Sequence, residues 1–219
     1  MNPDIVYEDK DIIVCHKPAG TATQSSRIGS PDMVSILKNH IYRTGGQKKE
    51  PYLAVIHRLD QPVEGLLVFA KTPAAAKELN RQLTAYGFGK FYRAIVCGCP
   101  DADEADLTDY LLKNGRTNMS EVCTADTKDA KEAVLHYKVI RSFTQNDSTY
   151  SLLEVTLKTG RHHQIRVQLS NAGFPIAGDR KYGSKTDASY RTLQLFACRL
   201  SFNHPRTKKP MTFELDLPE

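Results

Sequence analysis

The amino-acid sequence predicts an α+β fold built around a mixed, antiparallel-leaning sheet. Short segments in which apolar and polar residues alternate, typical of half-buried strands, recur along most of the chain. Only three segments carry apolar residues at helical spacing. The 219 residues contain no repeat and no clear linker, and they are enough to bury a sizeable core. We therefore expect residues 1–219 to form a single domain.

The N-terminal segment is expected to form two strands and a helix. Residues 5–8 and 12–17 are the predicted strands, separated by a charged turn at residues 9–11. A helix is predicted to begin at Ser30 and Pro31, because this pair is a typical start signal. Its core face would carry Val34, Leu37 and Ile41, and it would end at Gly45-Gly46.

Two continuous apolar segments, residues 53–56 and 66–70, are predicted to be buried strands. The polar segment 57–65 lies between them and is expected to form a loop. Thr72 and Pro73 then predict the cap of a second helix. The inward residues of that helix would be Ala76, Leu79 and Leu83.

The second half of the chain is expected to consist mainly of strands. Residues 90–96 form a predicted strand, followed by a turn at 98–100 and an acidic stretch that we expect to be rich in loops. One short helix is expected after Gly160, ending at Gly173. Its inward residues would be Ile165, Leu169 and Ala172, and further strands are predicted around 133–139, 153–157, 196–202 and 211–215.

The composition excludes several protein classes. With 40% hydrophobic and 25% charged residues, the chain is neither disordered nor collagen-like. No apolar run approaches the ~20 residues of a membrane-spanning helix, and the start lacks a signal-peptide pattern, so we expect a cytoplasmic protein that binds no membrane. Five cysteines without a Cys-x-x-Cys pair indicate neither disulfides nor a zinc site, although Cys97 and Cys99 are a weak metal-binding alternative.

Charge is distributed unevenly along the chain, whose formal net charge is +5. Residues 158–210 contain eleven basic and two acidic side chains, whereas residues 101–157 contain eleven acidic and six basic ones. The basic stretch predicts a positive face that binds a polyanion. The alternative is a solvated surface that happens to be rich in lysine.

The first polar motif is His57-Arg58-Leu59-Asp60, in the loop between two predicted buried strands. A carboxylate held near a guanidinium is available as a nucleophile or base at neutral pH, which makes Asp60 a candidate catalytic residue. A salt-bridged turn is the structural alternative. Glu64 lies nearby, and two carboxylates could act as acid and base in glycoside cleavage.

Two further motifs carry polar side chains. In Lys90-Phe91-Tyr92-Arg93-Ala94 an aromatic ring lies among basic residues, as in proteins that stack an unpaired base, although Tyr92 could equally be a core residue. In Gly160–Arg166 a helix start with arginines is suited to a phosphate or a carboxylate. Neighbouring histidines on a helix diverge by about 100°, so hydrogen bonding is favoured over zinc binding for His162 and His163.

In this order and spacing, the motifs resemble those of the RluA-type pseudouridine synthases over nearly the whole chain. The matching residues are Lys17-Pro18-Ala19-Gly20, His57-Arg58-Leu59-Asp60 with Gly65-Leu66-Leu67 and Ala70-Lys71-Thr72, Lys90-x-Tyr92-x-Ala94 with Gly98, Gly160-Arg161-x-His163-Gln164-Ile165-Arg166-Val167, Gly178-Asp179, Tyr182-Gly183 and His204-Pro205.

The resemblance implies an enzyme that isomerises a uridine of ribosomal or transfer RNA to pseudouridine, without a cofactor, a metal or an obligatory protein partner. Asp60 would be the catalytic aspartate, Tyr92 would pack on the target uracil, and Arg166 would pair with the Asp60 carboxylate. Arg58 would hold the loop or fill the space left by the extruded nucleotide. The implied fold is a mixed, largely antiparallel sheet with flanking helices and an RNA-binding cleft.

Two departures from the family pattern affect these expectations. Val63-Glu64 replaces the usual small polar pair, and Glu64 would repel a nearby phosphate. Lys17-Pro18 comes so early that no additional N-terminal RNA-binding domain is expected. The alternative functions are a non-catalytic RNA-binding module of the same fold and a ribonucleoside hydrolase that uses Asp60 and Glu64.

Overall fold

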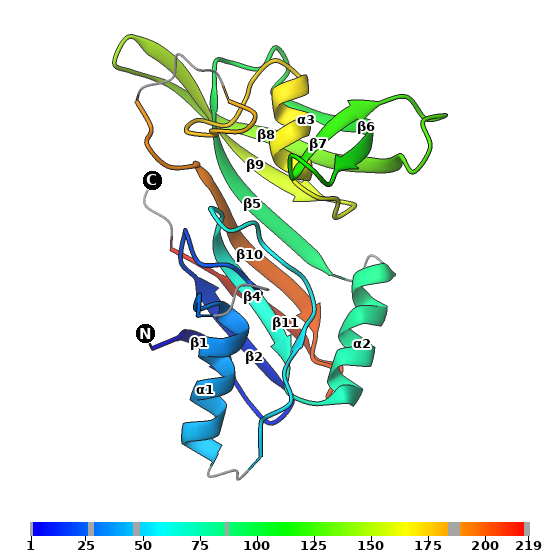
Figure 1. Ribbon diagram of the computed structural model, residues 1–219. Helices are drawn as coiled ribbons and strands as arrows, with labels where there is room; N and C mark the ends of the chain where they lie inside the picture. Colours follow the sequence, from blue (N-terminus) through cyan, green and yellow to red (C-terminus); the bar gives the residue numbers. More distant parts are fainter. Residues whose placement is uncertain (1, 26–28, 46–48, 86–87, 184–188, 217–219) are drawn as a thin grey trace. The chain divides into compact units, whose positions relative to one another are not determined.

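The structure, a computed structural model, describes residues 2–25, 29–45, 49–85, 88–183 and 189–216. The chain forms two compact units (Figure 1). The first unit consists of Met1–Lys90 and Ala197–Glu219, and the second of Phe91–Phe196. The boundary falls inside strands β5 (Gly89–Cys97) and β10 (Leu195–Asn203). Each unit has its own cluster of buried apolar side chains.

The first unit is a sheet with two helices. Its strands are β1 (Asp4–Glu8), β2 (Ile12–Lys17), β3 (Ala54–Val55), β4 (Glu64–Ala70), most of β10, and β11 (Pro210–Glu214). They lie in the order β1-β2-β4-β10, with β3 paired to β4 and β11 to β10. The pairs β1–β2, β2–β4, β3–β4 and β10–β11 are all antiparallel.

Strand β4 is the predicted continuous apolar segment 66–70, and both it and β2 are buried nearly throughout. Both have neighbouring strands on each side, so their backbone groups are paired and only apolar side chains fit around them. Their residues form the largest part of the core, which includes Ile12, Val14, Leu66, Val68, Leu79, Phe88 and Leu200. This core fixes the end of β2 at Lys17 and the start of β4 at Glu64, next to the polar motifs 17–20 and 57–60.

The two helices of the first unit are α1 (Met33–Gly45) and α2 (Pro73–Thr84). The predicted cap of α2 is confirmed, because the Thr72 hydroxyl accepts a hydrogen bond from the Ala75 N–H at 3.2 Å. Helix α2 packs on β3 and β4. Helix α1 lies beside β1 and β2 (Figure 1), and His40 Nε2 is 2.8 Å from the Glu8 carboxylate.

The predicted start of α1 at Ser30 was wrong. The helix begins at Met33 and is capped by Asp32, whose carboxylate accepts from the Ser35 N–H at 2.7 Å. Ser35 reciprocates, since its hydroxyl accepts from the Asp32 N–H at 3.0 Å. This reciprocal cap satisfies two backbone donors and places the capping residue at Asp32, so that the helix begins at Met33. The predicted end at Gly45 is confirmed, and Gly46 lies outside the described residues.

The second unit is an antiparallel sheet with one short helix. Its elements are β5, β6 (Glu104–Asn114), β7 (Met119–Cys123), β8 (Lys131–Gln145), β9 (Ser148–Leu157), α3 (Gln164–Asn171) and the first residues of β10. The strand order is β5-β9-β8-β6-β7. All four pairings are antiparallel. Helix α3 packs on β6 and β7, with Val167 against Leu111 and Ala133.

The expectation of a loop-rich acidic stretch was wrong, because residues 104–114 and 119–123 form β6 and β7. Two acidic side chains of β6, Glu104 and Asp106, are exposed, whereas Ala105 and Leu107 between and after them are partly covered. Asp109 lies on the covered face, where it accepts a hydrogen bond from Gln168 of α3. The stretch is therefore a strand pattern in which part of the acidic residues line the outer face.

The predicted buried strand at 53–56 was wrong in length and burial, because β3 has only two residues, both half-buried. The other predicted strands and the helix at 164–171 are confirmed, although Ala172 is exposed rather than inward.

No helix among the described residues is long and apolar enough to cross a membrane. The α+β class is confirmed, and each unit is built from antiparallel pairs. The expectation of a single domain stays a prediction.

Candidate active site

The loop that carries Asp60 connects β3 to β4 in the first unit. Leu59 and Val63 anchor it, with exposed fractions of 6% and 2%. Asp60 lies half-buried between these anchors, and Arg58 is exposed. The Val63 N–H donates to the Asp60 carbonyl at 3.0 Å, which closes a tight turn. The apolar residues thus fix the loop at two points and leave its polar side chains outside the core.

A second segment, 17–23, binds the backbone on both sides of Asp60. Before Asp60, the Thr23 hydroxyl donates to the Leu59 carbonyl at 3.0 Å and lies 3.2 Å from the Leu59 N–H. After Asp60, the Gly20 N–H donates to the Gln61 carbonyl at 2.9 Å, and the Gln61 side-chain amide donates to the Gly20 carbonyl at 2.9 Å. The backbone of Asp60 is therefore held between two fixed neighbours.

Lys17 is a fully buried cation beneath this loop. Its Nζ donates to the carbonyls of Pro18, Thr21 and Gln61 at 3.1, 2.7 and 3.1 Å. Burial lowers the pKa of Lys17 to about 8, although the nearby negative charges of Asp60 and Glu64 act in the opposite direction. Lys17 belongs to one of the sequence motifs, but the sequence assigned it no role. Its three hydrogen bonds show that it binds the backbone of the loop and of segment 17–23 together.

His57, the first residue of the motif, makes its contacts within its own unit. Its Nε2 accepts from the Val68 N–H at 3.3 Å, and its ring meets Phe88 edge-on. Burial, with a smaller contribution from Lys90, lowers the pKa of His57 to about 3, so the ring is neutral at physiological pH. Among the described residues its Nδ1 has no hydrogen-bond partner. His57 is therefore a partly buried, neutral ring that packs on Phe88 at the start of the loop.

Glu64, the departure from the family pattern, is part of an ion-pair chain on the edge of the first unit. His16 Nε2 lies 3.0 Å from Glu64, and His16 Nδ1 lies 3.0 Å from Asp4. A neutral imidazole can donate to only one of these two carboxylates, whereas a protonated imidazole can donate to both. Glu64 therefore has a hydrogen-bonding partner within the protein, and a protonated His16 would weaken the repulsion of phosphate that the sequence suggested.

Tyr92 lies on β5, opposite Val155 of β9, and is only 7% exposed. Its neighbour Phe91 is half-buried, as expected for side chains that alternate along a strand. The structure therefore places a largely covered aromatic ring at this position. Its packing on a uracil stays a prediction.

Arg166 lies on α3 and is 4% exposed. Its Nε and Nη2 donate to the two carboxylate oxygens of Asp179, both at 2.7 Å. Burial by itself would raise the pKa of Asp179, but the Arg166 guanidinium and two backbone N–H groups hold it below its usual value. This bidentate pair was not foreseen. The expected pairing of Arg166 with Asp60, which lies in the other unit, stays a prediction.

The start of α3 is built from hydrogen-bonding histidines, as expected. His163 is the residue before the helix and has a positive φ of 54°. Its Nδ1 is 2.8 Å from the Tyr182 hydroxyl, and His162 Nδ1 is 2.9 Å from the Ser120 hydroxyl. Among the described residues, neither histidine belongs to a group arranged to hold a metal.

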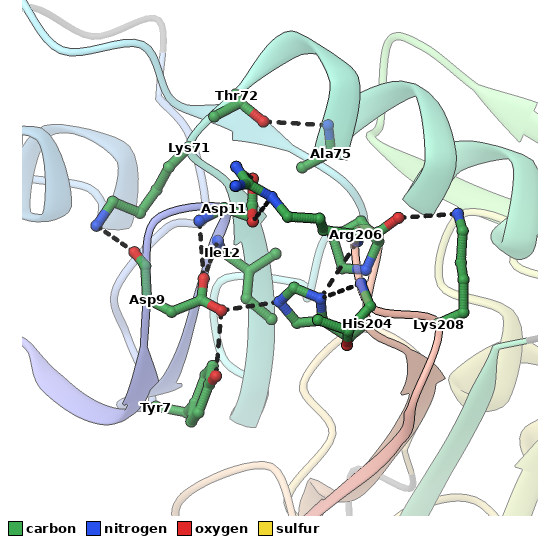
Figure 2. Close-up of polar contacts among 12 residues, drawn as sticks. Tyr7, Asp9, Asp11, Ile12, Lys71, Thr72, Ala75, His204, Arg206 and Lys208 are labelled. Atoms are coloured by element: carbon green, nitrogen blue, oxygen red, sulfur yellow. Dashed lines mark hydrogen bonds and ion pairs between the residues drawn. The ribbon is translucent and has the colours of Figure 1, made fainter.

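One cluster in the described residues has metal-like donors, namely Asp9, Asp11 and His204 in the first unit. Figure 2 shows that protein donors already occupy it. His204 Nε2 lies 2.8 Å from Asp9, while His204 Nδ1 accepts from two backbone N–H groups. Arg206 forms a bidentate pair with Asp11. The cluster therefore connects the turn between β10 and β11 to the turn between β1 and β2. This contact gives His204 of the His204-Pro205 motif a structural role.

The chain is similar to proteins of one family. The sequence profile described as "RNA pseudouridylate synthase" matches residues 11–171. An "Uncharacterized RNA pseudouridine synthase YlyB" from Bacillus subtilis (strain 168) is 34% identical over 220 residues, covering 100% of this chain and 70% of the relative. "Ribosomal large subunit pseudouridine synthase D" from Pseudomonas aeruginosa is 34% identical and covers 99% and 68%. "tRNA pseudouridine synthase C" from Vibrio cholerae is 30% identical and covers 99% and 91%.

A solved structure has the same fold. "Human RNA Pseudouridylate Synthase Domain Containing 4" aligns with a TM-score of 0.79 at 24% identity, covering 98% of this chain and 88% of that one. At this identity the likeness concerns the fold.

Proposed function

Because this chain belongs to the RNA pseudouridylate synthase family, we propose that it uses Asp60 to isomerise a uridine of ribosomal or transfer RNA. The chain is an RNA pseudouridine synthase, an isomerase that converts uridine in RNA into pseudouridine. In this reaction the N1–C1′ bond breaks and a C5–C1′ bond forms, while C5 loses a proton and N1 gains one. The reaction involves no oxidation or reduction and consumes no water, so the proposed step requires no cofactor.

The observation that carries the role of Asp60 is the way its loop is held. Leu59 and Gln61 are each bound through backbone atoms, whereas Asp60 stays half-buried between them. A carboxylate attached to a backbone that is fixed in this way has less conformational freedom to lose when the substrate binds, which favours a reactive role. Asp60 would either attack C1′ as a nucleophile or remove the 2′ proton to release uracil from a glycal.

The remaining site residues have supporting roles in this proposal. Arg58 lies exposed on the same loop and would hold the loop or fill the position of the extruded nucleotide. Tyr92 would stack on the uracil while the base turns from N1 to C5. Arg166 would pair with the Asp60 carboxylate and orient it. An RNA-binding cleft, a cytoplasmic location and activity without a protein partner also stay predictions.

The decisive experiment replaces Asp60 by Asn, which keeps the size of the side chain but removes the nucleophilic or basic oxygen. RNA labelled with tritium at C5 of uridine reports the reaction, because isomerisation releases that proton to water. Transcribed ribosomal and transfer RNAs serve as substrates under single-turnover conditions. We expect turnover to fall below detection while filter binding of the same RNA is retained. Turnover near the wild-type rate in this variant would remove Asp60 from the mechanism.

Product analysis separates the alternative functions. Pseudouridine in the digested RNA identifies the isomerase, free uracil identifies a hydrolase that uses Asp60 and Glu64, and unchanged RNA identifies a binding module. Glu64→Gln provides the matched arm: it should keep isomerisation, whereas a hydrolase of this kind would lose activity.

The role of Tyr92 is tested by two substitutions. Tyr92→Phe should retain most activity, because stacking on uracil needs only the ring. Tyr92→Ala should lose both base positioning and ~3–5 kcal/mol of stability, the usual cost of removing a buried aromatic side chain. Single-turnover rates and urea unfolding of both variants give the two readouts. Equal loss of turnover in both would instead assign the hydroxyl a role in proton transfer.

A further inference from the structure

We infer that Asp179 and Tyr182 are positioning residues that orient the Arg166 guanidinium for catalysis. The inference rests on the proposed function, in which Arg166 pairs with Asp60. Gly178-Asp179 and Tyr182-Gly183 were recognised as sequence motifs, but the proposed reaction gives them no direct task. Their contacts with Arg166 within the second unit supply one.

Asp179 binds one edge of the guanidinium. Nε and Nη2 of Arg166 each donate to a different oxygen of the carboxylate, both at 2.7 Å. A planar guanidinium held by two parallel hydrogen bonds cannot rotate about its long axis without breaking one of them. Asp179 uses two of the five N–H groups, so a contact with Asp60 has to use the other three. The bidentate pair therefore sets the direction in which those three groups point.

Asp179 is itself immobilised. Its side chain is fully buried, and Oδ1 also accepts from the backbone N–H groups of Lys181 and Tyr182 at 2.9 and 3.2 Å. The Gly183 N–H donates to the Asp179 carbonyl at 2.8 Å. A Cβ on Gly183 would lie 2.3 Å from that carbonyl oxygen, so only glycine allows this close turn. The carboxylate that accepts from Arg166 is thus held in one position by the backbone of its own loop.

Tyr182 covers a face of the same guanidinium. Arg166 Cζ lies 5.2 Å from the centroid of the ring, within the range of a cation–π contact. The hydroxyl at the far end of the ring accepts from the Ser120 N–H at 2.6 Å and lies 2.8 Å from His163 Nδ1. The Tyr182 carbonyl accepts from the Ser170 hydroxyl at 2.7 Å. Contacts with β7 and with both ends of α3 therefore fix Tyr182 through its hydroxyl and its backbone.

The guanidinium is consequently held at one edge and on one face before any substrate is present. Asp179 also neutralises Arg166, because the buried pair carries no net charge. An Asp60 carboxylate that joins them then shares one guanidinium with Asp179. Such preorganised partners act without reorganising during the reaction, and a small misplacement of the guanidinium would reduce the rate.

The test measures single-turnover rates and RNA affinity for Asp179→Asn. Asparagine keeps the size of the side chain, but it replaces one acceptor oxygen by an NH₂ group that repels the guanidinium. We expect the rate to fall ~10–100-fold, in the range seen for outer-shell partners, while the RNA dissociation constant changes less than ~3-fold. Asp106→Asn is the matched control, since Asp106 also pairs with a cation, Lys158, but at the exposed surface. It should leave the rate unchanged.

A double-mutant cycle distinguishes positioning from general folding. If Asp179 acts through Arg166, Asp179→Asn should change the rate less than ~2-fold in an Arg166→Met background. The same loss in both backgrounds would overturn the inference. If Asp179→Asn does not fold, Tyr182→Leu replaces it in the cycle, with Tyr182→Phe as the variant that keeps the ring.

The inference and the proposed function fail in different ways. Activity retained by Asp60→Asn contradicts the proposed function. Loss of activity in Asp60→Asn, together with a wild-type rate in both Asp179→Asn and Tyr182→Leu, contradicts only the positioning role.

Discussion

Asp60 and Arg166 are held in place in opposite ways. The Asp60 loop is fixed through the backbone of Leu59 and Gln61, which hydrogen-bond to the segment 17–23. Arg166 is fixed through its own side chain, which binds Asp179 in a bidentate pair. The first residue is thus placed by its neighbours in the chain, and the second by a partner for its functional group.

The difference follows from the local structure around each residue. A loop has no regular ladder, so its N–H and C=O groups need outside partners before the backbone has one conformation. Arg166 lies in a helix, which gives its backbone a regular conformation, so the direction of a long side chain is the main feature left to be determined. Changes near Asp60 should therefore alter stability and activity together, whereas changes near Arg166 should alter mainly the orientation of charge.

Among changes to the groups that hold Asp60 and Arg166 in place, the largest effect is expected from Lys17→Met. The substitution keeps an unbranched side chain but leaves three carbonyls without the Lys17 donor. We expect a loss of ~2 kcal/mol in the free energy of unfolding and a ~10–100-fold lower single-turnover rate. Urea unfolding and tritium release measure the two quantities. Lys38→Met, which removes a surface ion pair with Glu50, is the control and should change neither by much.

A smaller effect is expected from Gly183→Ala, which tests whether the Arg166 region can also be disturbed through its backbone. The new Cβ would meet the Asp179 carbonyl at 2.3 Å, so the turn has to shift and carry Asp179 with it. We expect a rate ~10-fold lower and a stability loss of ~1–2 kcal/mol. Gly115→Ala has open space around its Cβ and should behave like the wild type. Wild-type rates for Gly183→Ala would show that Asp179 tolerates this shift.

The next prediction concerns pH and isolates the buried Lys17. Its pKa is about 8 in the folded chain and 10.5 when unperturbed. Between these values the unfolded chain binds more protons, so this group makes the protein more stable as pH rises. We expect the difference in unfolding free energy between wild type and Lys17→Met to increase by ~1 kcal/mol from pH 7 to pH 9.

Urea unfolding of both proteins at each pH measures that difference. Taking the difference also removes most of the contribution of Cys15, whose pKa burial raises to about 12. Cys15 acts in the opposite direction above pH 9. A difference that stays constant over this range would show that Lys17 is not buried as a charged group.

The smallest effect is expected from Glu64→Ser, which restores a small polar residue beside the Asp60 loop. The lost ion pair with His16 is partly exposed, so stability should change by less than ~1 kcal/mol. Because Glu64 is already hydrogen-bonded to His16 and a single charge is screened by salt, RNA affinity should rise by no more than ~3-fold at physiological salt. Filter binding at two salt concentrations checks this. A much larger rise would mean that Glu64 repels the RNA directly.

Much of the fold could be predicted because its signals are local. Strand β4 is a continuous apolar segment, and Thr72-Pro73 is a cap signal that depends on adjacent residues alone. The start of α1 could not be predicted in this way, since both Ser30 and Asp32 are suitable caps. The choice depends on the Ser25 N–H, which comes from a preceding loop and donates to the Asp32 carboxylate at 2.6 Å.

The sequence by itself determined the order and spacing of the motifs, and these identified the family and made Asp60, Tyr92 and Arg166 candidates. Only the tertiary structure decided how their surroundings are built. It placed Lys17 beneath Gln61, 44 residues further along the chain, and it turned Asp179 toward Arg166. Local patterns report hydrophobicity and turn chemistry, but they carry no information on which distant groups become neighbours. That proximity arises when strands pair and helices pack, and it determines which buried charges find partners.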